Sequence, residues 1–232
     1  MKAKPIIQIV LALAIVALAY FVYSSILHPV RFDNEFTKRR DACAMKLKTI
    51  RTLEDAYKMT YGTYCGNFDT LINRLMTEDS LRIMQKVYNY SSIPADVDIN
   101  EISDLEAIKK GYMNRVETFV NPISQLRELG KLRITDAEGE VHDITDQEIR
   151  DVRFVPYPKD VEPYEFQLQA GMLDRSGLSV PVFECKVDLK DLLADMDHQD
   201  VINKIAELER INKYPGWKVG DMTQSITDGN FE

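Results

Sequence analysis

The densest group of potential metal ligands is the sequence Asp-Met-Asp-His-Gln-Asp at residues 195–200. Carboxylate oxygens bind Ca²⁺, and an EF-hand loop that began at Asp195 would require Gly at position 200 and Glu at position 206. The chain has Asp200 and Ala206 there. Asp197 or Asp200 can instead accept hydrogen bonds from the first amides of a following helix. We therefore expect a helix start here and no metal site.

Three cysteines and three histidines are the other side chains that could act as nucleophiles, bases or ligands. They form no C-x-x-C motif, and a helix between Cys43 and Cys65 would hold them about 27 Å apart, too far for a disulfide. Cys185 lies on an expected strand, which leaves a Cys65–Cys185 bridge open, but we expect buried free thiols. His142 follows a tight turn and is expected on the surface. His28 lies at the edge of an apolar segment.

Motifs of common enzyme classes do not occur: the sequence has no G-x-S-x-G, H-E-x-x-H, P-loop or dinucleotide fingerprint. The 232 residues include 29 basic and 37 acidic side chains, a net charge of −8, and 45% are hydrophobic. This composition is typical of a folded protein. An acidic chain is poorly suited to neutralise phosphates, so nucleic acid is not an expected partner. We expect a non-enzyme without a cofactor.

An uncharged apolar run extends from Ile6 to Leu27. As a helix it would be about 33 Å long, and the hydrocarbon core of a bilayer is about 30 Å thick. Pro29 has no N–H and disfavours the helical conformation at His28, so the helix is expected to end there. The sequence predicts a short tail at residues 1–5 and a transmembrane anchor at residues 6–28.

A cleaved signal peptide is the main alternative to this anchor. Lys2 and Lys4 precede the apolar run, and Ala17 and Ala19 have the small-x-small spacing of a cleavage site. Because the apolar run continues for eight residues beyond Ala19, an uncleaved anchor is favoured. Lys2 and Lys4 adjoin one end of the anchor, whereas only Arg31 is close to the other. The tail is therefore expected in the cytoplasm and the large domain in the periplasm, with the anchor in the inner membrane.

Four residues share one face of the anchor: Gln8, Ala12, Ala19 and Tyr23. Small side chains let helices approach closely in lipid, and an amide can hydrogen-bond to a neighbouring helix. The plainer interpretation, favoured by the absence of a GxxxG motif, is that Gln8 lies near the interface and the alanines have no specific contact. We keep these residues as a hypothetical partner-contact face.

The strongest pattern beyond the anchor is a stripe at helical spacing, which predicts a membrane-proximal amphipathic helix at residues 29–62. Asp33 or Asn34 is expected to cap its start, and Gly62 is expected to end it. Charged residues, among them Glu54, are expected on its other faces. Packing of the stripe on the chain's own domain is favoured, and a coiled-coil contact with another protein is the alternative. The stripe contains Phe36, Cys43, Leu47, Ile50, Leu53, Tyr57 and Tyr61, of which the last six are also kept as hypothetical partner contacts.

Residues 47–57, followed by Tyr-Gly-Thr-Tyr at 61–64 and Phe-Asp-Thr-Leu at 68–71, carry a resemblance. Together with the apolar run, they resemble the N-terminal part of type IV pilins and type II secretion pseudopilins, within an uncharacterised family of single-pass envelope proteins. The resemblance covers residues 1–75 and implies a subunit of an envelope assembly. Pilin precursors carry Gly directly before the apolar segment and Glu near the mature N-terminus. The first glycine here is Gly62 and the first acid is Asp33, so the chain lacks the prepilin peptidase site.

Residues 63–130 are predicted to be a helical and loop region. Asn67 or Asp69 is expected to cap a helix, which could restart at Thr77 and continue toward Val87. A loop is expected at residues 88–100. Two further helices have clear boundaries: a capping box from Ser103 to Glu106 with Gly111 at the end, and Asn121-Pro122 with Gly130.

Residues 131–220 are predicted to form an antiparallel sheet with a C-terminal helix. Two short strands are expected around a turn at 136–139, and a hairpin is expected from alternation at 164–169 and its return at 178–187. Pro181 indicates a strand edge. A helix is expected from 188 to 213 with a break near Asp197. The tail at residues 221–232 is expected to be loosely held, with Trp217 and Phe231 as potential anchors.

The fold class that follows is α+β: a transmembrane helix, a membrane-proximal amphipathic helix, and a globular domain with an antiparallel sheet. The expected function is a non-catalytic structural or scaffolding subunit of a secretion or pilus-like assembly. Its expected partners are membrane lipid and other envelope proteins or copies of itself. An anchored ligand-binding or sensor domain is the alternative, and it predicts a polar pocket beneath the hairpin at 164–187. An anchored hydrolase would require convergent acid, base or thiol groups in such a pocket.

Overall fold

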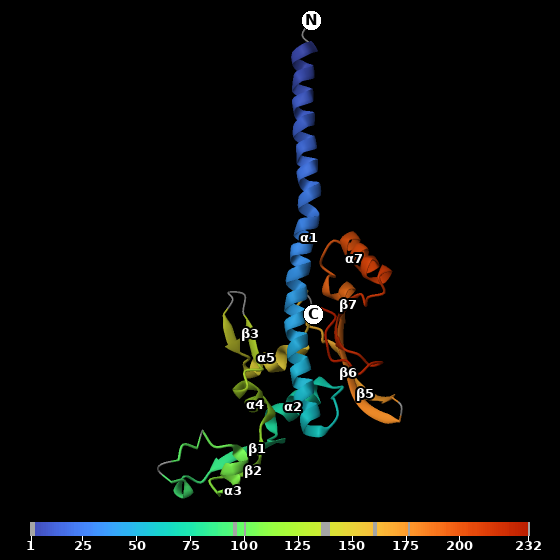
Figure 1. The fold of residues 1–232 in the computed structure, drawn as a ribbon. Coiled ribbons are helices and arrows are strands. Elements are labelled where there is room, and N and C mark those ends of the chain that lie inside the picture. The colour runs from blue at the N-terminus through green and yellow to red at the C-terminus, as the bar shows by residue number, and fades with distance from the viewer. Residues whose placement is uncertain are drawn as a thin grey trace.

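The computed structural model describes residues 3–94, 97–99, 101–135, 140–159, 162–175 and 177–231, without the side chains of residues 3–7, 9 and 26. The fold combines helices with antiparallel sheets, as expected for an α+β protein. One long helix, α1, starts at the N-terminal end of the molecule, and most of the other elements lie around its C-terminal half (Figure 1). These elements together form the head.

Helix α1 extends from Ala3 to Tyr61 without interruption and contains Pro29. The predicted helix end at His28–Pro29 is therefore wrong, and so is a second helix start capped by Asp33 or Asn34. A proline removes one helical hydrogen bond but does not force the chain to turn, so a long helix can continue through it. Gly62 does end the helix, with φ +80° and its N–H donating to the Lys58 carbonyl at 2.8 Å.

A three-stranded antiparallel sheet packs against one side of α1. It comprises β5 (Gln167–Arg175), β6 (Leu178–Asp188) and β7 (Gly216–Gly220), in the order β5-β6-β7. Strand β7 pairs with residues 184–188 of β6, so among the described residues it does not reach Pro181, which lies on a part of that β6 edge beyond β7, as its missing N–H predicts. Trp217 of β7 contacts Phe36 of α1 with ring centroids 5.8 Å apart.

Two helices connect β6 to β7: α6 (Leu189–Leu192) and α7 (His198–Arg210). The predicted break near Asp197 is confirmed, because the Asp197 side chain caps α7 by accepting from the amides of Gln199 and Asp200. Helix α7 lies nearest to the apolar part of α1 among the elements of the head (Figure 1). His28 Nδ1 lies 3.3 Å from an oxygen of Asp200, which joins the two helices there.

The other side of α1 is covered by α2 (Phe68–Thr77), α4 (Pro122–Glu128), α5 (Asp146–Arg150) and the single turn η2 (Asp151–Arg153). The predicted caps Asn67 and Asn121 are confirmed by their side-chain hydrogen bonds. Strands β3 (Arg133–Thr135) and β4 (Val141–Asp143) form the expected short hairpin, whose predicted turn at 136–139 lies outside the described residues. Helix α5, with its capping box from Thr145 to Glu148, was not predicted.

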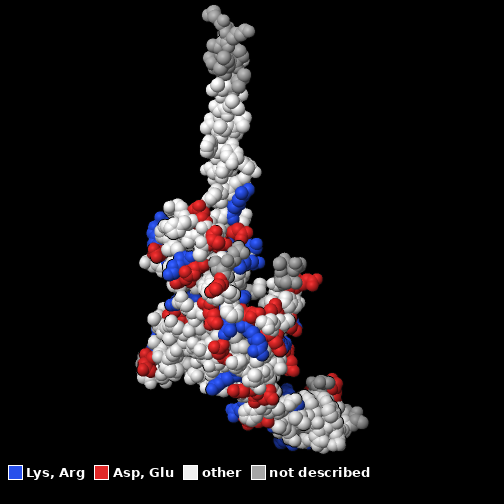
Figure 2. Space-filling view, turned by 180° about the vertical axis from the view of Figure 1, so that it is seen from behind, with Lys and Arg blue, Asp and Glu red and all other residues white. Residues whose placement is uncertain are grey.

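A second hairpin projects from the end of the head farthest from the N-terminus (Figures 1 and 2). It comprises β1 (Leu81–Tyr88), β2 (Met113–Val120), the turn η1 (Tyr90–Ser92) and α3 (Asp104–Lys109). The predicted continuation of a helix from Thr77 toward Val87 is therefore wrong. Glu78 already has extended dihedral angles, and Leu81, Ile83 and Val87 would share one face of a strand.

The tail after β7 is attached to the head, contrary to the expectation of a loose tail. Gly229 bridges to Val219, and the Asn230 side chain binds two backbone groups of β7. Trp217 is buried and Phe231 packs against the core, so both anchors are confirmed.

Candidate functional site

The part of α1 before the head, up to residue 25, is an apolar rod, and the first contact with the head is that of His28 with Asp200. Residue 8 and residues 10–25 are exposed, and this helix is long and apolar enough to cross a membrane. Figure 2 shows an uncharged column that rises from a head covered with both signs of charge. The hypothetical contact face Gln8, Ala12, Ala19 and Tyr23 is exposed throughout, so its contact with a partner stays a prediction.

The C-terminal half of α1 is a central element of the core, which confirms packing of the stripe on the chain's own domain. Cys43, Leu47, Ile50 and Leu53 have no exposed surface, and Tyr57 is buried. Tyr61 is partly buried, with its hydroxyl near Ser80. The hypothesis that these six residues contact a partner is therefore corrected, because the head already occupies their side chains.

Glu54 is a buried acid, so its expected position on another face of the helix is wrong. Its side chain has no exposed surface, one oxygen accepts from the Cys65 N–H at 2.8 Å, and the other has no partner among the described residues. Removal from water raises its pKa from 4.5 to about 8. The signal was present in the sequence, since Glu54 follows Leu47 by seven residues and Ile50 by four.

The three cysteines are buried free thiols, as predicted. Burial raises the pKa of Cys43 to about 12 and also raises the pKa values of Cys65 and Cys185. Because a thiolate is the reactive form, these side chains are poor nucleophiles at neutral pH.

The acidic cluster at residues 195–200 serves structural contacts. Asp195 binds Arg39 of α1, Asp197 caps α7, and Asp200 faces His28. The described residues contain no group of three or more His, Cys, Asp or Glu side chains placed to hold a metal ion. The helix start expected here is confirmed.

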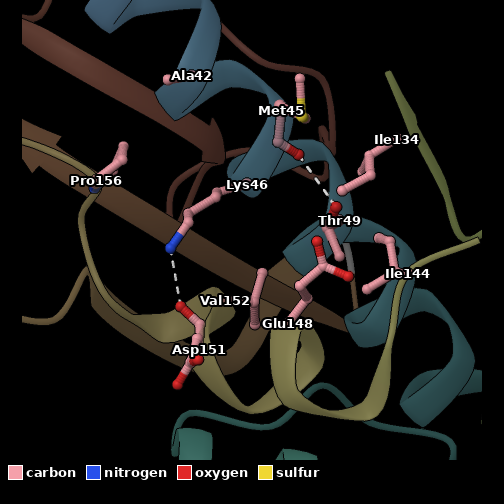
Figure 3. A pocket seen from close by; sticks show the side chains of 10 residues that line it. All are labelled: Ala42, Met45, Lys46, Thr49, Ile134, Ile144, Glu148, Asp151, Val152 and Pro156. Atoms are coloured by element: carbon pink, nitrogen blue, oxygen red, sulfur yellow. Dashed lines mark hydrogen bonds between the residues drawn. The ribbon is translucent and has the colours of Figure 1, made fainter. Parts of the chain in front are cut away.

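An apolar pocket of about 250 Å³ lies between α1, the β3–β4 hairpin and α5 (Figure 3). Lys46 turns away from its centre and donates to the carbonyls of Asp151 at 2.9 Å and Phe154 at 2.7 Å. The carboxylate of Glu148 points toward Thr49, and hydrogen bonds from Thr145 lower its pKa. The walls can take an apolar group, but an ionised Glu148 and a lysine bound to carbonyls do not make an acid–base pair. The pocket is lined by Ala42, Met45, Lys46, Thr49, Ile134, Ile144, Glu148, Asp151, Val152 and Pro156.

A second pocket, of about 310 Å³, lies between α1, residues 181–183 of β6 and residues 225–227 of the tail. Lys58 Nζ donates to the Tyr64 hydroxyl at 3.2 Å, and this hydroxyl lies 3.4 Å from a carboxylate oxygen of Asp55. Burial raises the pKa values of Asp55 and Tyr64. The pocket offers a cation, a hydroxyl and a carboxylate in line, which suits binding of a small polar molecule.

Comparison of the chain with protein-family models, with curated proteins and with solved structures finds no match.

Proposed function

We propose that this chain is a single-pass protein of the inner membrane, whose periplasmic head is a structural or scaffolding subunit of an envelope assembly such as a secretion or pilus-like machine. Residues 6–28 would cross the bilayer and residues 29–61 would form the membrane-proximal part of the same helix. The head would then contribute surfaces for assembly and no catalysis.

The observation that carries this proposal is the continuity of α1. One half of the helix is exposed and apolar, and the other half is the central core element of the head. An apolar helix of this length is unfavourable in water. It is stable where lipid or other apolar helices cover it. Because no flexible linker separates anchor from head, the helix would hold the head at a fixed distance from the bilayer.

Membrane extraction tests the anchor. The full chain is expected to stay in the membrane pellet through alkaline carbonate and to enter solution with detergent, and a variant without residues 6–27 is expected in the soluble fraction. Recovery of the full chain in the soluble fraction would overturn the proposal.

Co-purification tests the assembly role. In the Ala12→Leu/Ala19→Leu variant, larger side chains on the hypothetical contact face are expected to reduce recovery of partners in mild detergent. Ala14→Leu/Ala17→Leu is the matched control, because it makes the same change on the opposite face of the helix. Equal recovery of partners with both variants would reject this face, and a chain that purifies without partners would argue against the scaffold.

An anchored ligand-binding domain is a second candidate function, favoured by the polar pocket at β6. A thermal-shift screen of the full chain against amino acids, short dicarboxylates and monosaccharides tests it. A stabilising compound is expected to lose its effect in Lys58→Met and to keep it in Lys48→Met, where the lysine is exposed on another face of α1. A screen without any stabilising compound would count against this function.

A further inference from the structure

The projecting hairpin, residues 81–120, exposes several large apolar side chains. A two-stranded hairpin is marginally stable by itself in water, and grouped apolar exposure commonly marks an interaction surface. This arm, residues 81–120, is therefore a small sheet whose apolar side chains another chain could cover. Its exposed large apolar residues are Met84, Val87, Tyr90, Leu105, Ile108, Val116 and Phe119.

Helix α3 covers only one face of the arm. Asp104 binds Lys86 of β1 at 2.8 Å and Arg115 of β2 at 3.0 Å, so α3 crosses the face that carries these two side chains. Gln85 and Val116 oppose each other in the ladder, and their side chains lie on the other face. Val116 is 45% exposed there.

The outer edge of β2 is also open. The sheet has the order β1-β2, and no third strand pairs with it in the described part of the chain. An open edge can pair with an added strand. Strand β1 carries Arg82 and Lys86, whose like charges oppose pairing with a second β1. Strand β2 carries Arg115 and Glu117, on one face and symmetric about Val116.

We propose that two copies of this chain pair through antiparallel β2 strands, with the two-fold axis at Val116. This register places Arg115 opposite Glu117 of the second copy, and the reverse, and each opposite-charge pair stabilises the strand pairing. Within each copy Arg115 already binds Asp104, and Glu117 binds Arg82 at 2.9 Å. On the α3 face, Asp104 and Arg115 of one copy would therefore continue into Glu117 and Arg82 of the second copy as a chain of ion pairs, and the two-fold axis repeats this chain.

The pairing also extends the face opposite α3, where Val87 and Val116 are the exposed large apolar residues of the two strands. Val116 of the two copies would be in direct contact, and the four strands together would form one continuous sheet. This inference goes beyond the proposed function, because it concerns a strand edge remote from the anchor and does not require a membrane.

Site-specific disulfide formation in the full chain tests the register. Directly opposed residues in an antiparallel pair have Cα atoms about 4.5–5.5 Å apart, within the range that a disulfide spans. Val116→Cys is expected to form a covalent dimer under mild oxidation. Val87→Cys is the matched control, since it is 47% exposed on the same face but lies on β1, and it is expected to stay monomeric. The native cysteines are buried, so they are not expected to form cross-links under these conditions.

Two further positions make the test specific for the register. Asn114 would oppose Thr118 of the second copy, so Asn114→Cys and Thr118→Cys are each expected to stay monomeric. The double variant is expected to form dimers, because within one strand these residues are about 13 Å apart and cannot bridge. Equal cross-linking of Val116→Cys and Val87→Cys, or none with either, would overturn the proposal. Cross-linking through Val116 that persists in Ala12→Leu/Ala19→Leu would separate this contact from one made by the anchor.

Discussion

Arg39 of α1 and Asp195, which lies between α6 and α7, form two parallel hydrogen bonds across 156 residues of sequence. The guanidinium is buried and also donates to the Leu192 carbonyl at 2.9 Å. Such fork-shaped pairs are stronger than neutral hydrogen bonds. This contact attaches the segment around α6 and α7 to the long helix.

Arg39→Met is therefore expected to lower the free energy of unfolding by about 2 kcal/mol, less than for a fully buried pair because Asp195 keeps access to water. Urea unfolding of the full chain in detergent measures it. Arg40→Met is the control, since Arg40 pairs with its exposed neighbour Asp41, and a change below about 0.5 kcal/mol is expected there. Equal losses in the two variants would contradict the proposed attachment.

Because Glu54 is buried, we expect the free energy of unfolding to decrease as the pH rises. Its pKa is about 8 in the folded chain and 4.5 as a model value. Below pH 4.5 the group is protonated in both states, so it has no effect. Between these values folding requires uptake of a proton, and stability falls by about 1.4 kcal/mol per pH unit. Above pH 8 Glu54 is ionised in both states, so the free energy of unfolding stays at its lowered value.

Glu54→Gln removes this titration while keeping an acceptor for the Cys65 N–H. Between pH 5 and pH 8, the wild-type chain is expected to lose about 3 kcal/mol relative to the variant. Chemical unfolding at several pH values measures the difference. Any effect of the amide on stability that is independent of pH cancels in this comparison. Glu128→Gln, at an exposed acid, is expected to follow the wild type. Parallel pH curves for wild type and Glu54→Gln would show that Glu54 is accessible to water.

The parts of the fold predicted from the sequence have local signals. Asn67 and Asn121 cap helices by contacts within three residues, and the alternation at 164–169 marks the approach to β5. Strand β7 was missed because its five residues are defined by pairing with β6, about 30 residues earlier. The continuity of α1 through Pro29 was missed because a local rule for proline does not include the support of the helix on either side.

The candidate site was only partly predictable for the same reason. Spacing by three and four residues identified the stripe of α1, but the interpretation assumed that charged residues lie outside the core. Glu54 and Arg39 occupy positions on the buried side. Their burial depends on partners distant in sequence, Cys65 and Asp195, which periodicity does not reveal.

We expect the side chain of Asn230 to hold the tail on β7. Its side chain donates to the Gly216 carbonyl at 2.9 Å and accepts from the Lys218 N–H at 2.9 Å, on either side of Trp217. Asn230→Ala is expected to cost about 1–2 kcal/mol, since two backbone groups lose a partner. The tail should then be cleaved faster by limited proteolysis. Asn203→Ala, at an exposed position of α7, is the control, and an unchanged cleavage rate in Asn230→Ala would indicate that the backbone bridge of Gly229 and the packing of Phe231 hold the tail without this side chain.

We predict that the turn at Pro29, directly beyond the apolar run, is the weakest turn of α1. It cannot donate to the carbonyl of Ser25, and its ring crowds that turn, whereas the contact of His28 with Asp200 supports the same turn from α7. Pro29→Ala is expected to slow amide hydrogen exchange around residue 29 at least about tenfold, because a helical hydrogen bond is gained and a steric conflict is lost. Val30→Ala, which leaves every helical hydrogen bond in place, is expected to show no such slowing. His28→Ala should have the opposite effect, with faster exchange at this turn. If Pro29→Ala and Val30→Ala exchange alike, the turn at Pro29 is as stable as its neighbours, and the head is then attached to the anchor without a weak point.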